Sequence, residues 1–133
     1  MAISSAICNS FKQEILVGTH NLTASSGDTF KIALYTSSAS LGAGTTAYST
    51  SNEITNTSGS AYTAGGATLT SVTPVLDSST AVCDFADVSF TSASFTANGC
   101  LIYNDSQSDK AVAVIAFGGD KTVSSGTFTI QFP

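Results

Sequence analysis

The residues that could perform chemistry in this chain are few and lie far apart. A Ser-His-Asp triad would need the single histidine, His20, which lies in a Gly-Thr-His-Asn stretch typical of a surface turn. Glycoside hydrolysis needs two facing carboxylates. Asp84 and Asp87 flank an expected β-bulge, where solvated acids are much commoner than catalytic ones. We therefore predict that the chain is not an enzyme and has no catalytic residues.

Metal and cofactor sites are also weakly indicated. The run from Asn104 to Asp109 offers several oxygens of the kind that calcium prefers, but it lacks the central glycine and closing glutamate of an EF-hand. A polar hairpin turn is the better interpretation. The pairs Gly65-Gly66 and Gly118-Gly119 are followed by neither a helix start nor the lysine of a phosphate loop. We predict no metal-binding and no cofactor-binding residues.

The thiols and aromatic hydroxyls leave two questions open. The three cysteines have no CxxC spacing and are expected to be small buried hydrophobes, with a disulfide between Cys83 and Cys100 as the alternative. The tyrosines could line a sugar or protein site, or they could pack on strands with a hydrated hydroxyl. The residues concerned are Cys8, Cys83, Cys100, Tyr35, Tyr48, Tyr62 and Tyr103.

Composition excludes several partners. The 133 residues suit one domain, and nine acids against four lysines, with no arginine, give a net charge of -5. Such a chain cannot present the basic face that nucleic acids or anionic membranes require. No apolar run approaches the ~18 residues of a membrane span. The N-terminus lacks a basic start and an apolar stretch, so we expect no secretory signal and synthesis in a cytosol.

The elements that must position these residues are mostly strands. One helix is expected from about Ser10 to Val17, with a stripe of Ile7, Phe11 and Ile15, a Ser10/Gln13 capping box and Gly18 after its end. Period-two or apolar runs then predict strands. These run over Phe30–Tyr35, Ala67–Leu76 with a bulge or edge at Pro74, Ala81–Phe90 with a bulge near Ala86-Asp87, Phe95–Tyr103, Ala111–Phe117 and Phe128–Phe132.

These patterns predict an all-β fold, an antiparallel β-sandwich of jelly-roll type with one short N-terminal helix. We expect a single domain over residues 1–133, with an N-terminal helical segment at 1–22 and a long polar loop at 37–64. Strand Phe30–Tyr35 should be half-buried, Ala111–Phe117 should be buried on both faces, and Gly118–Lys121 should form a turn. Glu53 is the only charged residue of the long loop.

Several stretches of the chain resemble small tailed-bacteriophage virion structural proteins of the capsid decoration, or cement, type. The resemblance covers almost the whole chain and brings no catalytic residues. The stretches that carry it are NSFKQEIL, KIALYTSSASLGAGTTAYSTSNEIT, GSAYTAGGATLT, CDFADVSF, FTANGCLIYND and KAVAVIAFGGDKTVSSGTFTIQFP.

The resemblance implies a decoration protein on the outer surface of a phage head shell, made in the bacterial cytoplasm. Its implied partners are the major capsid protein or other virion proteins and further copies of itself, a trimer above all. The alternative is a tail or head-fibre component that acts as a receptor-binding or adhesion module. Low charge and small hydroxyl side chains suit close packing of many copies. We expect residues 1–22 or 37–64 to make the contacts.

Overall fold

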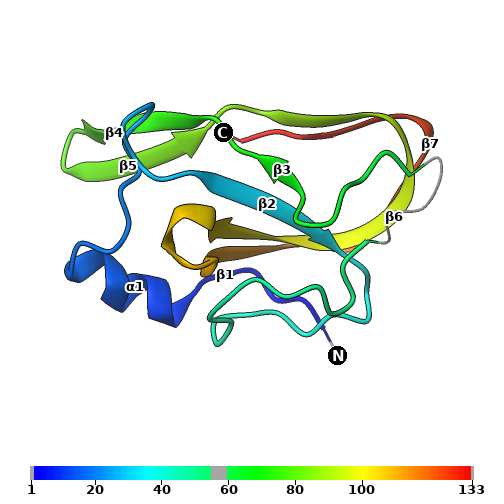
Figure 1. Ribbon diagram of the computed structural model, residues 1–133, viewed down its shortest axis with the longest axis horizontal. Coiled ribbons are helices and arrows are strands. Elements are labelled where there is room, and N and C mark those ends of the chain that lie inside the picture. Colours follow the sequence, from blue (N-terminus) through cyan, green and yellow to red (C-terminus); the bar gives the residue numbers. More distant parts are fainter. Residues whose placement is uncertain (1, 55–59, 133) are drawn as a thin grey trace.

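One long β-hairpin organises the chain. The computed structural model describes residues 2–54 and 60–132. Its longest strands, β6 (Val88–Asn104) and β7 (Lys110–Ile130), pair antiparallel and are joined by the 3-10 helix η1 (Asp105–Gln107). They occupy the middle of a five-stranded sheet of order β1-β7-β6-β2-β3, while β4 and β5 form a separate two-stranded sheet (Figure 1). The predicted all-β, antiparallel, sandwich-like fold with one short helix is confirmed.

The elements follow one another along the described chain, with α1 near its start. Their bounds are β1 (Ala6–Ile7), α1 (Asn9–Leu16), β2 (Phe30–Tyr35), β3 (Ala67–Thr68), β4 (Ser71–Asp77), β5 (Thr80–Phe85), β6 (Val88–Asn104), η1 (Asp105–Gln107) and β7 (Lys110–Ile130).

A bulge in β7 bends this hairpin. Gly99 pairs with Ala116 and Ala97 pairs with Lys121, so four residues of β7 lie opposite Asn98 alone. Gly118 and Gly119 lie within this bulge at φ 79° and 149°, a backbone region that favours glycine. The predicted turn at Gly118–Lys121 is therefore wrong, because the strand continues through it. The ribbon instead curves over, and Figure 1 shows its two halves at different levels of the molecule.

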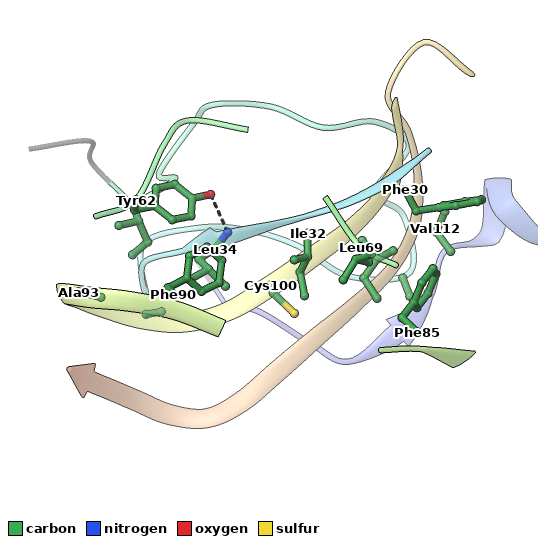
Figure 2. Close-up of a cluster of buried hydrophobic side chains, with 14 residues drawn as sticks. Phe30, Ile32, Leu34, Tyr62, Leu69, Phe85, Phe90, Ala93, Cys100 and Val112 are labelled. Carbon is green, nitrogen blue, oxygen red and sulfur yellow. Dashed lines mark hydrogen bonds between the residues drawn. The ribbon is translucent and has the colours of Figure 1, made fainter. Parts of the chain in front are cut away.

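The core fills the space that the bent hairpin encloses. Phe90 and Phe95 come from the far half of the hairpin and contact the ring of Tyr62 at centroid distances of 5.8 and 6.2 Å. Ile102 and Val112 come from the near half and belong to the same cluster. Figure 2 shows Tyr62, Phe90 and Val112 around β2, with Cys100 and Ile32 at the centre. Aromatic side chains from the far half and aliphatic side chains from the near half therefore share one core between the two layers.

Strand β2 is more deeply buried than its sequence pattern predicts. All of its residues except Lys31 are buried, whereas alternation had indicated one hydrated face. A second cluster covers the other face and includes Ile3, Cys8, Tyr35 and Leu101. The N-terminal segment and the long polar loop supply this cover, and neither has an apolar periodicity that would reveal it.

Helix α1 forms where it was expected but faces the core differently. It ends before Gly18, which has φ 80°. The predicted capping box is wrong, because the residue before the helix is Cys8 and the buried Ser10 hydroxyl has no hydrogen-bond partner in the described residues. Of the predicted stripe, only Phe11 packs on the core, while Ile7 and Ile15 are exposed.

Two predicted strands are each divided in the structure. The run from Ala67 to Leu76 contains β3 and β4, and the run from Ala81 to Phe90 contains β5 and the start of β6. The predicted bulge at Ala86-Asp87 is a break between strands of different sheets. By contrast, the register shift between Val72 and Val75 confirms the irregularity expected at Pro74.

Gly66 provides a test of this packing. Its φ is 83°, and a Cβ built on it would lie 1.8 Å from the carbonyl oxygen of Ile32. Gly66→Ala should therefore lower the free energy of unfolding by about 3 kcal/mol, as strain and backbone displacement combine. Gly44→Ala is the control, because nothing lies within 4 Å of its Cβ position, and it should stay within about 0.5 kcal/mol. Equal urea midpoints for both variants would contradict this account.

Candidate functional site

A buried carboxylate gathers the long loop against the sheet. Glu53 accepts hydrogen bonds from the hydroxyls of Tyr48 at 2.6 Å and Tyr62 at 2.5 Å, and from the backbone N–H of Gly65 at 2.8 Å. Glu53 is buried, although among the described residues no cation lies against it. Three donors satisfy its charge instead, as a buried carboxylate requires. The only charged residue of the polar loop thus helps to hold that loop against the fold.

The tyrosines extend this network to both clusters of the core. Tyr62 also accepts a hydrogen bond from the backbone N–H of Leu34 at 2.9 Å (Figure 2). Tyr35 donates to the carbonyl of Ser49 and Tyr103 donates to the carbonyl of Gly65, each at 2.6 Å. The rings of Tyr48 and Tyr103 stack with their centroids 4.6 Å apart. The hydroxyls of Tyr35, Tyr62 and Tyr103 therefore bond to backbone groups and Tyr48 stacks on a strand residue, and the first three side chains are fully buried.

Electrostatics keep these hydroxyls protonated. Burial first, and then the nearby Glu53 carboxylate, raises the pKa of Tyr48 and Tyr62 well above the ordinary value. Burial also raises the pKa of Tyr35 and Tyr103. A protonated hydroxyl is the state that can donate to Glu53 and to the loop carbonyls. The four tyrosines therefore have a structural role, and Tyr35, Tyr62 and Tyr103 are too buried for a sugar to stack on their rings.

His20 lies in a second polar cluster and not in a surface turn. It is buried, and its Nε2 lies 2.9 Å from a Glu14 oxygen. Asn104 donates from Nδ2 to Asp28 and accepts from Ser106 N–H, which fixes the orientation of its amide. The same Nδ2 therefore donates to His20 Nδ1 at 2.9 Å. The prediction of an exposed turn was wrong because Phe11 and Phe30 cover the ring.

Asp28, an acid of this cluster, has a lowered pKa. Although burial alone would raise it, hydrogen bonds from the Asn104 amide, the Asn21 N–H and the Gln107 amide bring the pKa of Asp28 below its ordinary 3.8. The ionised form of Asp28 is therefore the form that the fold binds. Its contacts join the segment after α1 to the end of β6 and to η1.

The other candidate ligands remain apart. Asp84 accepts from the N–H of Phe85, and Asp87 accepts from the N–H of Phe132, so the two carboxylates satisfy different backbone groups. In the run from Asn104 to Asp109, which was predicted to be a polar hairpin turn, Asn104 is buried, and burial together with Asp105 raises the pKa of Asp109. Within residues 2–54 and 60–132, no group of three or more acidic, histidine or cysteine side chains could hold a metal ion.

The cysteines differ from one another in burial. Cys8 and Cys100 are buried, as predicted, and burial raises the pKa of Cys100 to about 12. Cys83 is exposed, so its predicted burial is wrong. It lies on β5 where that strand extends beyond the core. All three thiols are free, which excludes the alternative disulfide between Cys83 and Cys100.

An open groove lies between the N-terminal segment and the long loop. Its volume is about 820 Å³, and its lining contains no charged side chain. Hydroxyls and small residues dominate it, among them Ser4, Ser38, Thr45, Ser49 and Ser51. Such a surface offers neutral hydrogen-bonding groups but no acid, base or nucleophile activated by a neighbour.

Exposed apolar side chains come from two segments of the described chain. One is the region of β1 and α1, where Leu16 is 85% exposed, and the other is the β4–β5 hairpin, where Leu76 is 74% exposed. Figure 1 shows the end of α1 and the tip of the hairpin at the same end of the molecule. The large exposed residues are Ile7, Ile15, Leu16, Val17, Val72, Val75, Leu76 and Val82. Apolar surface gathered in this way is typical of interaction sites.

Comparisons with known proteins add no relative. No protein-family model, curated protein or solved structure matches the chain. In the part of the chain that the structure describes, no helix is long and apolar enough to cross a membrane.

The role of the buried carboxylate can be measured. Glu53→Gln replaces one acceptor oxygen by an NH₂ group that faces a tyrosine hydroxyl or the Gly65 N–H, and it removes the charge that strengthens the remaining bonds. We expect a loss of about 2–3 kcal/mol in unfolding free energy. Asp120→Asn changes an exposed acid in the same way and should cost no more than about 0.5 kcal/mol. Similar urea curves for the two variants would show that Glu53 is not the attachment.

The Asp28 cluster predicts a pH dependence. Because the folded-state pKa lies below the unfolded value, Asp28 contributes stability above about pH 4, and this contribution disappears as the pH falls through the folded-state pKa. Asp28→Asn should cost about 1–2 kcal/mol at pH 7. The difference in unfolding free energy between wild type and variant, measured by urea titration at several pH values, should decrease below pH 4. A gap that stays constant to pH 2.5 would refute this assignment.

Proposed function

We propose that this chain is a structural binding protein of a phage-type virion, a decoration protein that attaches to the outer surface of the head shell and stabilises it. The observation that carries the proposal is the apolar end of the molecule, at α1 and the β4–β5 hairpin, on an otherwise polar and weakly charged body. The sequence resemblance supplies the virion context and the partner, the major capsid protein or another virion protein. The proposal includes no catalysis and no cofactor.

The use of the ionisable groups supports binding over catalysis. Glu53, His20 and Asp28 each hold one segment of chain to another. The open groove has no charged lining residue. An enzyme would direct such groups at a shared reacting centre. Here these groups form hydrogen bonds within the fold. That arrangement suits a rigid structural protein.

The structure favours one of the two segments expected to make contacts. Hydrogen bonds of Glu53, Tyr35 and Tyr103 hold the long loop and the adjacent Gly65 in place. The polar groups in these bonds are therefore not free to bind a partner. The segment 1–22 presents Leu16 and Val17, which are among the most exposed apolar residues. We propose that this end of α1 contacts the shell. Burial of two such side chains contributes about 1.5–3 kcal/mol each, and repetition over many sites adds to the shell's stability.

A second candidate is a receptor-binding module of a tail or head fibre. The observation that favours it is the groove of about 820 Å³ with its neutral hydroxyl lining, which suits an uncharged polar ligand such as a glycan. The groove and the apolar end lie on different residues, so the two functions can be tested separately.

The test is to count the protein on particles. Shells that lack the protein are mixed with the wild type or with Leu16→Lys/Val17→Lys, and occupancy is measured by cryo-electron microscopy. We expect many regularly placed wild-type copies and a loss of occupancy for the variant, because two ammonium groups cannot enter an apolar contact. Thr45→Ala, in the groove, is the control and should decorate normally.

Other outcomes would overturn the decoration role. Wild-type protein that fails to bind shells, or that occurs only in a few copies at a tail or vertex, contradicts it. Binding to glycans that is lost in the Thr45→Ala variant, together with normal stability, would establish the receptor-binding alternative instead.

A further inference from the structure

The hydrogen bonds of His20 fit only one of its protonation states. Its side chain is fully enclosed, and the rings of Phe11 and Phe30 lie at centroid distances of 4.8 and 6.4 Å. Nε2 lies 2.9 Å from Glu14 Oε1, and Nδ1 lies 2.9 Å from Asn104 Nδ2. Because the NH₂ group of Asn104 can only donate, Nδ1 is the acceptor. The imidazole is therefore neutral, and its proton lies on Nε2 and is donated to Glu14.

The side-chain amide of Asn104 has two possible orientations, and the present one suits three neighbours. Nδ2 donates to His20 at 2.9 Å and to Asp28 at 2.8 Å, and Oδ1 accepts from the N–H of Ser106 at 3.0 Å. The last bond caps the N-terminus of η1, the turn between the two longest strands. Rotation of the amide by half a turn would exchange its donor and acceptor ends, so the three contacts depend on one another.

A proton on His20 Nδ1 would place two donors opposite each other. Imidazole is the side chain that ordinarily changes its charge between pH 5 and 8. The imidazolium charge would be stabilised by Glu14, which contacts Nε2, and by Asp28, which shares the Asn104 NH₂ group. The Lys110 ammonium, 4.0 Å from Glu14 Oε2, offsets part of this attraction. Because the ring is enclosed, the new N–H needs an acceptor within the fold.

We propose that protonation of His20 turns the Asn104 amide and thereby removes the cap of η1. In the turned state Oδ1 accepts from the imidazolium Nδ1–H, and Nδ2 faces the N–H of Ser106, which loses its bond. Asp28 loses one of its donors at the same time. This amide is a two-state element that couples the charge of one imidazole to the turn between β6 and β7. The switch does not depend on the virion role.

Nuclear magnetic resonance can follow both ends of this switch in the wild-type chain. At about pH 8 the ring nitrogens of His20 should show a neutral imidazole with its proton on Nε2. As the pH falls to about 5, ring protonation and an upfield shift of the Ser106 amide proton should share one midpoint. Exchange of that proton, corrected for the intrinsic effect of pH, should become about tenfold faster. The amide of Ser51, which bonds to Ser49 Oγ at 3.1 Å, is the control and should keep its chemical shift.

Each of three results would overturn the proposal. One is a neutral ring with its proton on Nδ1, and another is a ring that stays neutral down to pH 5. The third is a Ser106 amide that does not respond while the ring becomes charged. In His20→Gln, which has no titrating ring, the Ser106 amide should be independent of pH. A response equal to that of the wild type would assign the effect to another group.

Asn104→Asp separates the turning of the amide from a general effect of the charge on His20. A carboxylate offers an acceptor oxygen to the ring and to the Ser106 N–H at once, so neither contact excludes the other. The Ser106 amide of this variant should keep its shift while the ring is protonated. A response like that of the wild type would refute the turning amide. The wild-type titration decides the question even where a variant does not fold.

Discussion

Burial of the Glu53 carboxylate is the constraint on which the fold's polar half depends. A long loop of small polar residues has little apolar surface with which to attach itself, so its position must come from hydrogen bonds. One charge with three donors provides this, and the tyrosine rings that donate also fill the space between loop and sheet. Without Glu53, the buried hydroxyl of Tyr62 and the hydroxyl of Tyr48 would lose their acceptor, and the part of the cover of β2 that the loop supplies would lose this attachment.

The bent hairpin is the corresponding constraint on the apolar half. Antiparallel pairing makes β6 and β7 one ribbon, and the bulge at Gly118-Gly119 lets that ribbon fold over its own side chains. Phe95 packs on Phe128 within the far half, while Phe85 packs on Phe30 across the layers. The β4–β5 hairpin adds Phe85, at the base of β5, to this core, and the rest of the hairpin extends from the body.

Local pattern predicted most elements, and long-range contacts account for the errors. Residue spacing predicted the helix, β2 and the period-two strands, and Pro74 predicted the irregular pairing of β4. The strand through Gly118-Gly119 was mistaken for a turn because a double glycine favours both a turn and a bulge. His20 and Cys83 were misplaced because burial depends on which segments cover them, and those segments lie far away in sequence. The tyrosine cluster had one signal in the sequence, which was Glu53 as the single acid in an otherwise uncharged loop.

The pairing of β1 with β7 has a consequence for the order of folding. Ala6 lies opposite Val114, so almost the whole chain forms the loop that this contact closes. The turn from Asn104 to Lys110 closes only a short loop, and its strands can pair at little entropic cost. The hairpin around η1 is therefore the natural nucleus, and the N-terminal segment docks late. The ribosome synthesises the N-terminal segment first, whereas β7, the strand with which β1 pairs, is synthesised last.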